Sequence, residues 1–199
     1  MKKASICLLL ILFISFGCKQ KQSDQTAATD NDFQLVDIKK IRENPVALFA
    51  DNWFVVTAGN DSAYNQMTIS WGALGSLWNS PVATIYIRDS RYTYQFIDKG
   101  KYFTLCAFDD AYREKVLYIG SHSGKDSDKL KVTGLTPLKT KLGNIFYKEA
   151  RLVLECEKIY SDDLHPENIL DSVGKNNYKN TDSKHRMFIG KILNVWEKK

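Results

Sequence analysis

The sequence is poor in the residues from which metal sites and disulfide frameworks are built. Its 199 residues include four cysteines and three histidines, with no Cys-x-x-Cys pair and no cluster of histidines. A zinc centre needs closely spaced sulfur or imidazole ligands, so no metal site is expected. Cys106 and Cys156 lie in apolar, strand-like stretches. Buried free thiols are the expected state, and one disulfide between them is the alternative.

Recognisable catalytic motifs are also scarce. The spacing supports neither a Ser-His-Asp nor a Cys-His arrangement, and no paired carboxylate motif stands out. Residues 120–129 contain a Gly-x-x-x-Gly-Lys stretch that is one residue shorter than a P-loop, and Asp126 replaces its magnesium-binding hydroxyl. Binding of a nucleoside triphosphate is therefore excluded. The segment is either a loop that touches a ligand or a flexible connector.

The charge balance is mild and mixed. The formal net charge is +5, and basic and acidic residues are interspersed without a long block of either sign. Proteins that bind nucleic acid concentrate basic residues on one surface, so nucleic acid is not an expected partner.

A short apolar run at the N-terminus predicts export. Residues 6–16 follow two lysines and are apolar for about eleven residues, where a membrane-spanning helix needs about twenty. The run ends at Ser-Phe-Gly-Cys, which resembles the cleavage site of a bacterial lipoprotein. We therefore expect residues 1–17 to be a signal peptide and Cys18 to be lipidated. A plain signal peptide with an incidental cysteine is the alternative.

The segment after the expected cleavage site is a tether. Residues 18–32 are polar and cannot bury enough surface to become ordered. Residues 33–199 then form one domain of ordinary size. The expected location is the bacterial cell envelope, facing the periplasm or the surface, with the membrane contacted through the lipid anchor only.

The domain reads as many short strands with few helices. Strands are expected near residues 53–58, 66–70, 82–88, 102–107, 151–157 and 187–196. Helices are expected near residues 90–98, 111–119 and 126–131, the first capped by Asp89 or Ser90. Leu152, Leu154 and Cys156 share one strand face by the two-residue period. This pattern is typical of a mainly β fold, an antiparallel barrel with added helices.

The strand expected near residues 66–70 carries polar side chains at positions where a buried strand would usually have apolar ones. Thr68 and Ser70 share a face of this strand, and Asn65 adds a side-chain amide just before it. Met67 and Trp71 point the other way, toward a core or the apolar side of a ligand. The alternative is that the hydroxyls decorate a solvated strand face.

A second cluster follows the strand over residues 82–88. Arg88 and Arg91 bring two guanidiniums, and Ser90 and Thr93 bring two hydroxyls, to an expected helix start. Such a group favours an anion. A local ion pair with Asp89 is the alternative. Together with the polar strand, the cluster indicates a phosphorylated, planar, hydrogen-bonding ligand, and flavin mononucleotide (FMN) fits this description.

These motifs resemble a known family. They are Asn65-x-Met67-Thr68-x-Ser70-Trp71, the strand after Pro81 leading to Arg88-x-x-Arg91-x-Thr93, Phe103, Ser123-Gly124-x-x-x-Asp128-Lys129 and His185-x-x-x-x-Gly190. In order and spacing the chain resembles the flavin reductase-like group of FMN-binding split-barrel proteins, over about residues 49–196.

The resemblance implies a six-stranded antiparallel split β-barrel, a homodimer, and FMN bound near the subunit interface. It places the flavin ring against the strand over residues 65–70. It places the phosphate near Arg88, Ser90, Arg91 and Thr93. Ser123, Asp128 and Lys129 would lie near the ring or the ribityl chain, and His185 would be the catalytic residue that contacts a nicotinamide cofactor.

Three functions follow from the resemblance. The first is an envelope-anchored, FMN-dependent oxidoreductase that takes hydride from NADH, NADPH or another donor and passes electrons to flavin or another acceptor. The second is a non-catalytic FMN-binding or electron-carrier lipoprotein. The third, a haem-binding use of the barrel, is disfavoured because no histidine lies in an expected strand. Turnover of a nicotinamide cofactor separates the first two functions, and an absorbance spectrum tests the third.

Overall fold

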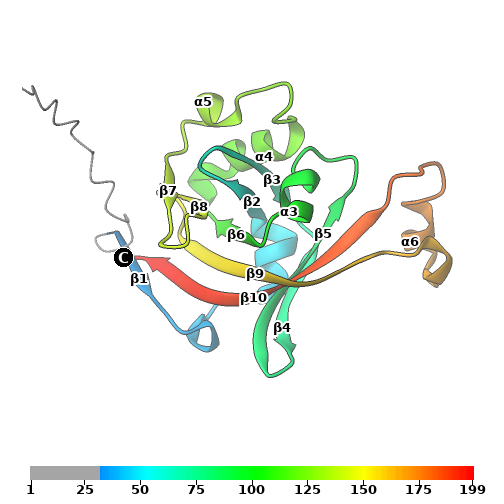
Figure 1. The fold of residues 1–199 in the computed structure, drawn as a ribbon, viewed down its shortest axis with the longest axis horizontal. Coiled ribbons are helices and arrows are strands. Elements are labelled where there is room, and N and C mark those ends of the chain that lie inside the picture. The colour runs from blue at the N-terminus through cyan, green and yellow to red at the C-terminus, as the bar shows by residue number, and fades with distance from the viewer. Residues whose placement is uncertain (1–31) are drawn as a thin grey trace, which may run out of the picture.

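Residues 32–199 fold around one curled antiparallel sheet in the computed structural model (Figure 1). The expected signal peptide, Cys18 and residues 18–31 of the expected tether lie outside the described residues. No helix within residues 32–199 combines the length and the apolar character needed to cross a bilayer.

Eight strands form the main sheet, in the order β3-β2-β6-β9-β10-β5-β4, with β1 added beside β10. They are β1 (Phe33–Leu35), β2 (Phe54–Asn60), β3 (Ala63–Ile69), β4 (Gly72–Leu77), β5 (Ser80–Arg88), β6 (Tyr102–Ala107), β9 (Leu152–Asp163) and β10 (His185–Lys198). Every pairing is antiparallel, and β7 (Pro137–Lys139) and β8 (Ile145–Tyr147) form a separate antiparallel pair. The mainly β split-barrel fold is therefore confirmed.

The sheet exceeds the expected six strands by β1 and β4. Strand β4 contains Gly72 and Gly75, and glycine weakens a strand signal because it brings no side chain to pack. The turn between β4 and β5 also lacks a clear sequence signal. Its two central residues, Trp78 and Asn79, adopt φ values of 47° and 57°. Hairpins with this geometry usually carry Asn-Gly or Asp-Gly. The hairpin was not expected because the sequence has tryptophan at one of these turn positions.

Two cores cover the two faces of the sheet. Inside the barrel, Val56, Leu105, Leu154 and Phe188 belong to one buried cluster. On the outer face a second cluster brings together the following side chains: Val55, Cys106, Val116, Ile119, Phe146, Val153 and Trp196. Strands that are buried on both faces do not alternate cleanly between apolar and polar residues.

The face shared by Leu152, Leu154 and Cys156 lies in the inner core, as expected. Cys156 and Cys106 are both buried free thiols, which confirms the expected state. Burial raises the pKa of the Cys106 thiol to about 12, so this thiol stays protonated and inert.

Short helical segments fill the connections. They are η1 (Ile38–Lys40), α2 (Pro45–Ala47), the π-helical η2 (Leu48–Asn52), α3 (Tyr94–Lys99), η3 (Asp110–Tyr112), α4 (Arg113–Ser121), α5 (Lys129–Thr133), η4 (Pro166–Asn168) and α6 (Ser172–Asn176). Helix α4 matches its expected range closely. Helix α3 begins four residues later than expected, because residues 89–93 form turns. The expected cap at Asp89 or Ser90 is therefore wrong.

The barrel is split between β3 and β4. These strands follow one another in the chain, joined by Ser70 and Trp71, yet they occupy opposite ends of the strand order. Strand β5, the neighbour of β4, lies close to β3 across the split. The chain therefore crosses from one sheet edge to the other at Ser70 and Trp71.

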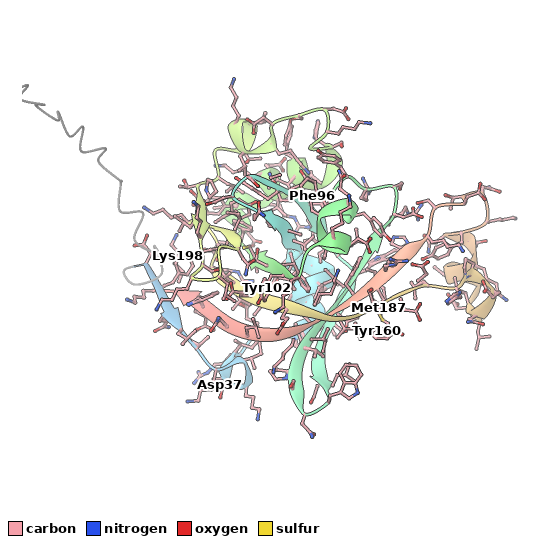
Figure 2. All side chains as sticks on the ribbon, in the orientation of Figure 1. Asp37, Phe96, Tyr102, Tyr160, Met187 and Lys198 are labelled. Atoms are coloured by element: carbon pink, nitrogen blue, oxygen red, sulfur yellow. The ribbon has the colours of Figure 1, made fainter. Side chains whose placement is uncertain are left out.

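An arm projects from the far ends of β9 and β10 (Figure 1). It consists of residues 164–184 and contains η4 and α6. Figure 2 shows Tyr160 and Met187 at the base of the arm, on the adjacent strands β9 and β10. Leu170 and Val173 on the arm are 91% and 68% exposed, so most of the arm lies away from the barrel core.

Candidate functional site

Two adjoining pockets lie at the split in the barrel. The larger, here called the Trp71 pocket, has a volume of about 320 Å³. Its lining comprises residues 67–71, Tyr86, Arg88, Arg91, Asn177 and His185. The smaller, here called the Lys129 pocket, has a volume of about 90 Å³. Its lining comprises Asn65, Met67, residues 90–93, Gly120, residues 122–124 and Lys129. The two pockets share Met67 and Arg91, so one elongated ligand can occupy both.

Both pockets are cationic. No aspartate or glutamate lines either of them, and within residues 32–199 no carboxylate lies at ion-pair distance from Arg88 or Arg91. The expected alternative, an ion pair with Asp89, does not form. The Asp89 carboxylate instead accepts from the Ser183 hydroxyl and from the Lys184 backbone N–H at 3.2 Å. The two guanidiniums are therefore available to an anionic ligand.

Lys129 is a buried cation at the floor of the smaller pocket. The side chain is 3% exposed, and its Nζ donates to the backbone oxygens of Gln66 at 2.5 Å and Ile119 at 3.0 Å. Burial, together with the nearby Arg91, lowers the pKa of Lys129 to about 8. An anion in this pocket would stabilise the protonated amine and raise that pKa again.

Asn65 and Gly124 form a close contact in the wall of the Lys129 pocket. Asn65, on β3, is 5% exposed and donates through Nδ2 to the Thr93 hydroxyl at 2.7 Å. A Cβ at Gly124 would lie 1.9 Å from the Asn65 Oδ1, so only glycine fits opposite this side chain. The loop between α4 and α5 approaches β3 here because of that missing side chain.

Thr68 faces away from the inner core, toward α4 on the outer face of the sheet. Its hydroxyl donates to the Val116 backbone oxygen at 2.5 Å, and its side chain packs beside Gly120. The donor capacity of the hydroxyl is therefore used within the protein. Ser70 is exposed at the end of β3 and lines the Trp71 pocket.

His185 is the first residue of β10, so the expectation that no histidine lies in a strand is wrong. It pairs with Arg88 of β5, and its ring lies 4.8 Å from the Trp71 ring. The Tyr178 hydroxyl lies 2.8 Å from His185 Nδ1. Burial, aided by Arg88 and Arg91, lowers the pKa of His185 to about 4 despite Asp89. The imidazole is therefore neutral at physiological pH.

The remaining expected residues lie at the edges of the pockets. The hydroxyl oxygens of Ser90 and Ser183 lie 3.1 Å apart, and Ser123 accepts from the Lys125 backbone N–H at 3.2 Å. Asp128 caps α5 by accepting from the Lys131 backbone N–H at 3.1 Å. Asp128 lines neither cationic pocket but a third opening of about 460 Å³, which adjoins the Lys129 pocket and shares Asn65, Gly124 and Lys129 with it.

The structure brings most of the expected residues to one place. Those that line the two cationic pockets are Asn65, Met67, Thr68, Ser70, Trp71, Arg88, Ser90, Arg91, Thr93, Ser123, Lys129 and His185. The sequence reasoning missed Tyr86, Asn177 and Tyr178. Tyr86 is two residues before Arg88 on the same strand face, which was an available signal. The other two lie in the arm, where no sequence pattern marked them.

Solved structures with low sequence identity share this fold. A flavoredoxin from Methanosarcina acetivorans is 20% identical, with a TM-score of 0.57 over 73% of this chain and 68% of that one. An FMN-binding protein from Thermus thermophilus is 19% identical, with a TM-score of 0.59 over 79% of this chain and 78% of that one. The FMN-binding domain of a flavin reductases-like enzyme from Shewanella baltica is 19% identical, with a TM-score of 0.59 over 84% of this chain and 78% of that one. No curated protein matches the sequence.

A family model matches most of the sequence. The model, described as the flavin reductase like domain, covers residues 46–199, which include every strand of the main sheet except β1 and every side chain that lines the two cationic pockets. The chain therefore belongs to the family of flavin reductase like domains.

Proposed function

We propose that the protein is an FMN-dependent oxidoreductase of the flavin reductase type. The observation that carries this proposal is the pair of adjoining pockets, with two arginines and one lysine and no carboxylate in their linings. Their volumes of about 320 and 90 Å³ suit a small-molecule ligand with one bulky part and one compact anionic part. Membership of the family supports a flavin as that ligand.

The residues present fit FMN. In this proposal the phosphate lies in the Lys129 pocket, where Arg91, Ser90 and Thr93 line the space as the resemblance implies. The pocket lining moves three residues from the places implied by the resemblance: Lys129 and Ser123 join the phosphate site, and Arg88 lines the Trp71 pocket instead. A carboxylate in that pocket would repel the phosphate, and none is present in its lining.

The ring would lie in the Trp71 pocket. Met67 and Trp71 offer apolar surface there, and Ser70 and Asn177 offer hydrogen bonds. The chemistry that FMN supplies when bound is acceptance of hydride at N5 and transfer of electrons to an acceptor. These side chains would orient the ring, and His185, which lines the same pocket, would contact the electron donor.

An absorbance titration tests the proposal. FMN is added to the purified protein, and its visible bands are expected to shift on binding, with saturation at one flavin per chain. NADH or NADPH is then supplied with an added electron acceptor, and steady oxidation of the nicotinamide is expected. Failure to bind FMN would refute the flavin site, and absorbance in the haem region instead of the flavin region would point to the haem alternative.

A second function is favoured by Ser183 and Lys184. Ser183 and Lys184 precede His185 where reductases that resemble this chain often carry an acidic residue. A flavoredoxin also shares the fold. A non-catalytic FMN-binding or electron-carrier protein is therefore the alternative, and tight FMN binding without nicotinamide turnover would establish it.

The assembly and location are part of the same proposal. A homodimer with FMN near the subunit interface follows from the family resemblance, and light scattering of the purified protein tests it. Lipidation of Cys18 and anchoring in the cell envelope follow from the N-terminal sequence. Labelling with a radioactive fatty acid, compared between the natural chain and a Cys18→Ser variant, tests the anchor.

A further inference from the structure

Tyr178 belongs to the arm but contacts the first residue of β10. Its hydroxyl oxygen lies 2.8 Å from His185 Nδ1, and the two rings meet edge to face with centroids 5.7 Å apart. The neighbouring Asn177 lines the Trp71 pocket. The arm thus delivers a second layer of side chains to the candidate site.

We propose that Tyr178 is a positioning residue that fixes His185 as the neutral tautomer with its proton on Nε2. The inference deepens the proposed function, on which its catalytic consequence rests. A phenol is a better hydrogen-bond donor than acceptor, and the bare nitrogen of a neutral imidazole is a good acceptor. The hydroxyl therefore donates to Nδ1, and the single imidazole proton is left on Nε2.

The surroundings of His185 keep the imidazole neutral and restrict its orientation. Arg88 lies opposite it in the β5–β10 ladder, and Arg91 is also close, while Asp89 provides the only opposing charge in its environment among the described residues. The Trp71 ring covers one side of the imidazole at 4.8 Å. Burial also raises the pKa of Tyr178, so its hydroxyl keeps the proton that it donates.

A fixed Nε2–H gives the Trp71 pocket a neutral donor. Such a donor suits the carbonyl or carboxamide oxygen of a planar ligand beside the flavin, because it binds the oxygen without placing a second positive charge near the arginines. Without Tyr178 the proton would exchange between the two nitrogens. The donor would then be present in only part of the molecules.

Nitrogen NMR of the full chain labelled with ¹⁵N at histidine tests the tautomer directly. The His185 signals are identified by their loss in a His185→Gln variant. In the natural protein, Nε2 is expected to be protonated and Nδ1 unprotonated near neutral pH. In Tyr178→Phe, which keeps the ring but removes the hydroxyl, both tautomers are expected.

Tyr160→Phe is the matched control. Tyr160 lies at the base of the arm (Figure 2), and its hydroxyl donates to Asp162 at 3.1 Å. Its removal should leave the His185 signals unchanged. A proton on Nδ1 in the natural protein, or a pure Nε2–H tautomer in Tyr178→Phe, would overturn the inference. The first of these outcomes needs no variant and so does not depend on the folding of Tyr178→Phe.

Kinetics separate this inference from the proposed function. In the FMN-loaded enzyme, Tyr178→Phe is expected to raise KM for the nicotinamide donor by about 2- to 10-fold and to leave the FMN dissociation constant unchanged. Absence of FMN binding by the natural protein would refute the proposed function and leave the tautomer result standing. Normal FMN turnover with the wrong tautomer would refute only the role of Tyr178.

Discussion

Gly124 makes room for Asn65, and replacing it with alanine tests whether that contact shapes the site. The new Cβ would lie 1.9 Å from the Asn65 Oδ1 and 2.9 Å from its Cγ. Asn65 is 5% exposed and is held by its 2.7 Å hydrogen bond to Thr93, so it cannot turn aside without breaking that bond.

The expected cost follows from the broken bond. Loss of a buried side-chain hydrogen bond costs about 1–3 kcal/mol, and the reduced freedom of the unfolded chain returns about 0.4–1 kcal/mol of this for a Gly→Ala change. The free energy of unfolding should therefore fall by up to about 2.6 kcal/mol. For a chain of this size that lowers Tm by up to about 10 °C. FMN affinity should fall as well, because the clash lies in the wall of the Lys129 pocket.

A double-mutant cycle makes the test specific. In an Asn65→Ala background the clash is absent, so Gly124→Ala should be neutral or stabilising by about 0.4–1 kcal/mol. Gly75→Ala is the control, since a Cβ at Gly75 meets nothing within 4 Å and should cost no stability. Thermal melts and FMN titrations supply the measurements. An equal cost of Gly124→Ala in both backgrounds would refute the reasoning.

Three further substitutions test the charges of the site. Arg91→Ala should weaken FMN binding by about 1.5–3 kcal/mol in a fluorescence titration, because hydrogen bonds to charged groups are worth about that much. The control is Arg42→Ala, which removes an exposed arginine and should leave the FMN affinity unchanged. FMN affinity should decline as the pH rises above about 8, since the Lys129 pKa is lowered to about 8 and the neutral amine loses its attraction for phosphate; Lys129→Met should flatten that decline. Stability should fall as the pH drops from about 6.5 toward 4, because His185 accepts a proton at about pH 4 in the folded state and at about 6.5 when unfolded. Unfolding of His185→Gln in denaturant at several pH values should show a weaker pH dependence, and an unchanged dependence would contradict the assignment.

The sequence predicted the strands whose periodicity is carried by large apolar residues. Both halves of the hairpin between β2 and β3, and strands β5, β6, β9 and β10, were all expected. The β4–β5 hairpin was missed because β4 is rich in small residues and its turn has Trp78 where a glycine signal would be expected. The late start of α3 was also missed. Asp89 resembles a helix cap in sequence, but its carboxylate binds Ser183 and Lys184, which are far away in the chain.

The residues of the candidate site also fall into those that a local sequence pattern predicts and those that depend on tertiary packing. Arg88 and Arg91 were predictable because their spacing is local, and so was the polar strand with Asn65. The engagement of Thr68 with α4 and the burial of Lys129 under β3 depend on tertiary packing that no local pattern encodes. The contribution of the arm depends on where β9 and β10 lead it, which is set by the sheet as a whole.

Because the barrel is split between β3 and β4, a ligand bound at the split would also stabilise the fold. Local opening of the barrel is expected to be easiest where its ladder of hydrogen bonds is interrupted. In the chain, the two edges at this split are joined by the short link through Ser70 and Trp71. A ligand that touches Met67 on β3, Arg88 on β5 and His185 on β10 clamps both edges together. At a ligand concentration of 100 times Kd the clamp adds about 2.7 kcal/mol, and slowed amide hydrogen exchange along β3 would be its signature. The cofactor would then stabilise the folded barrel as well as supply its reactive group.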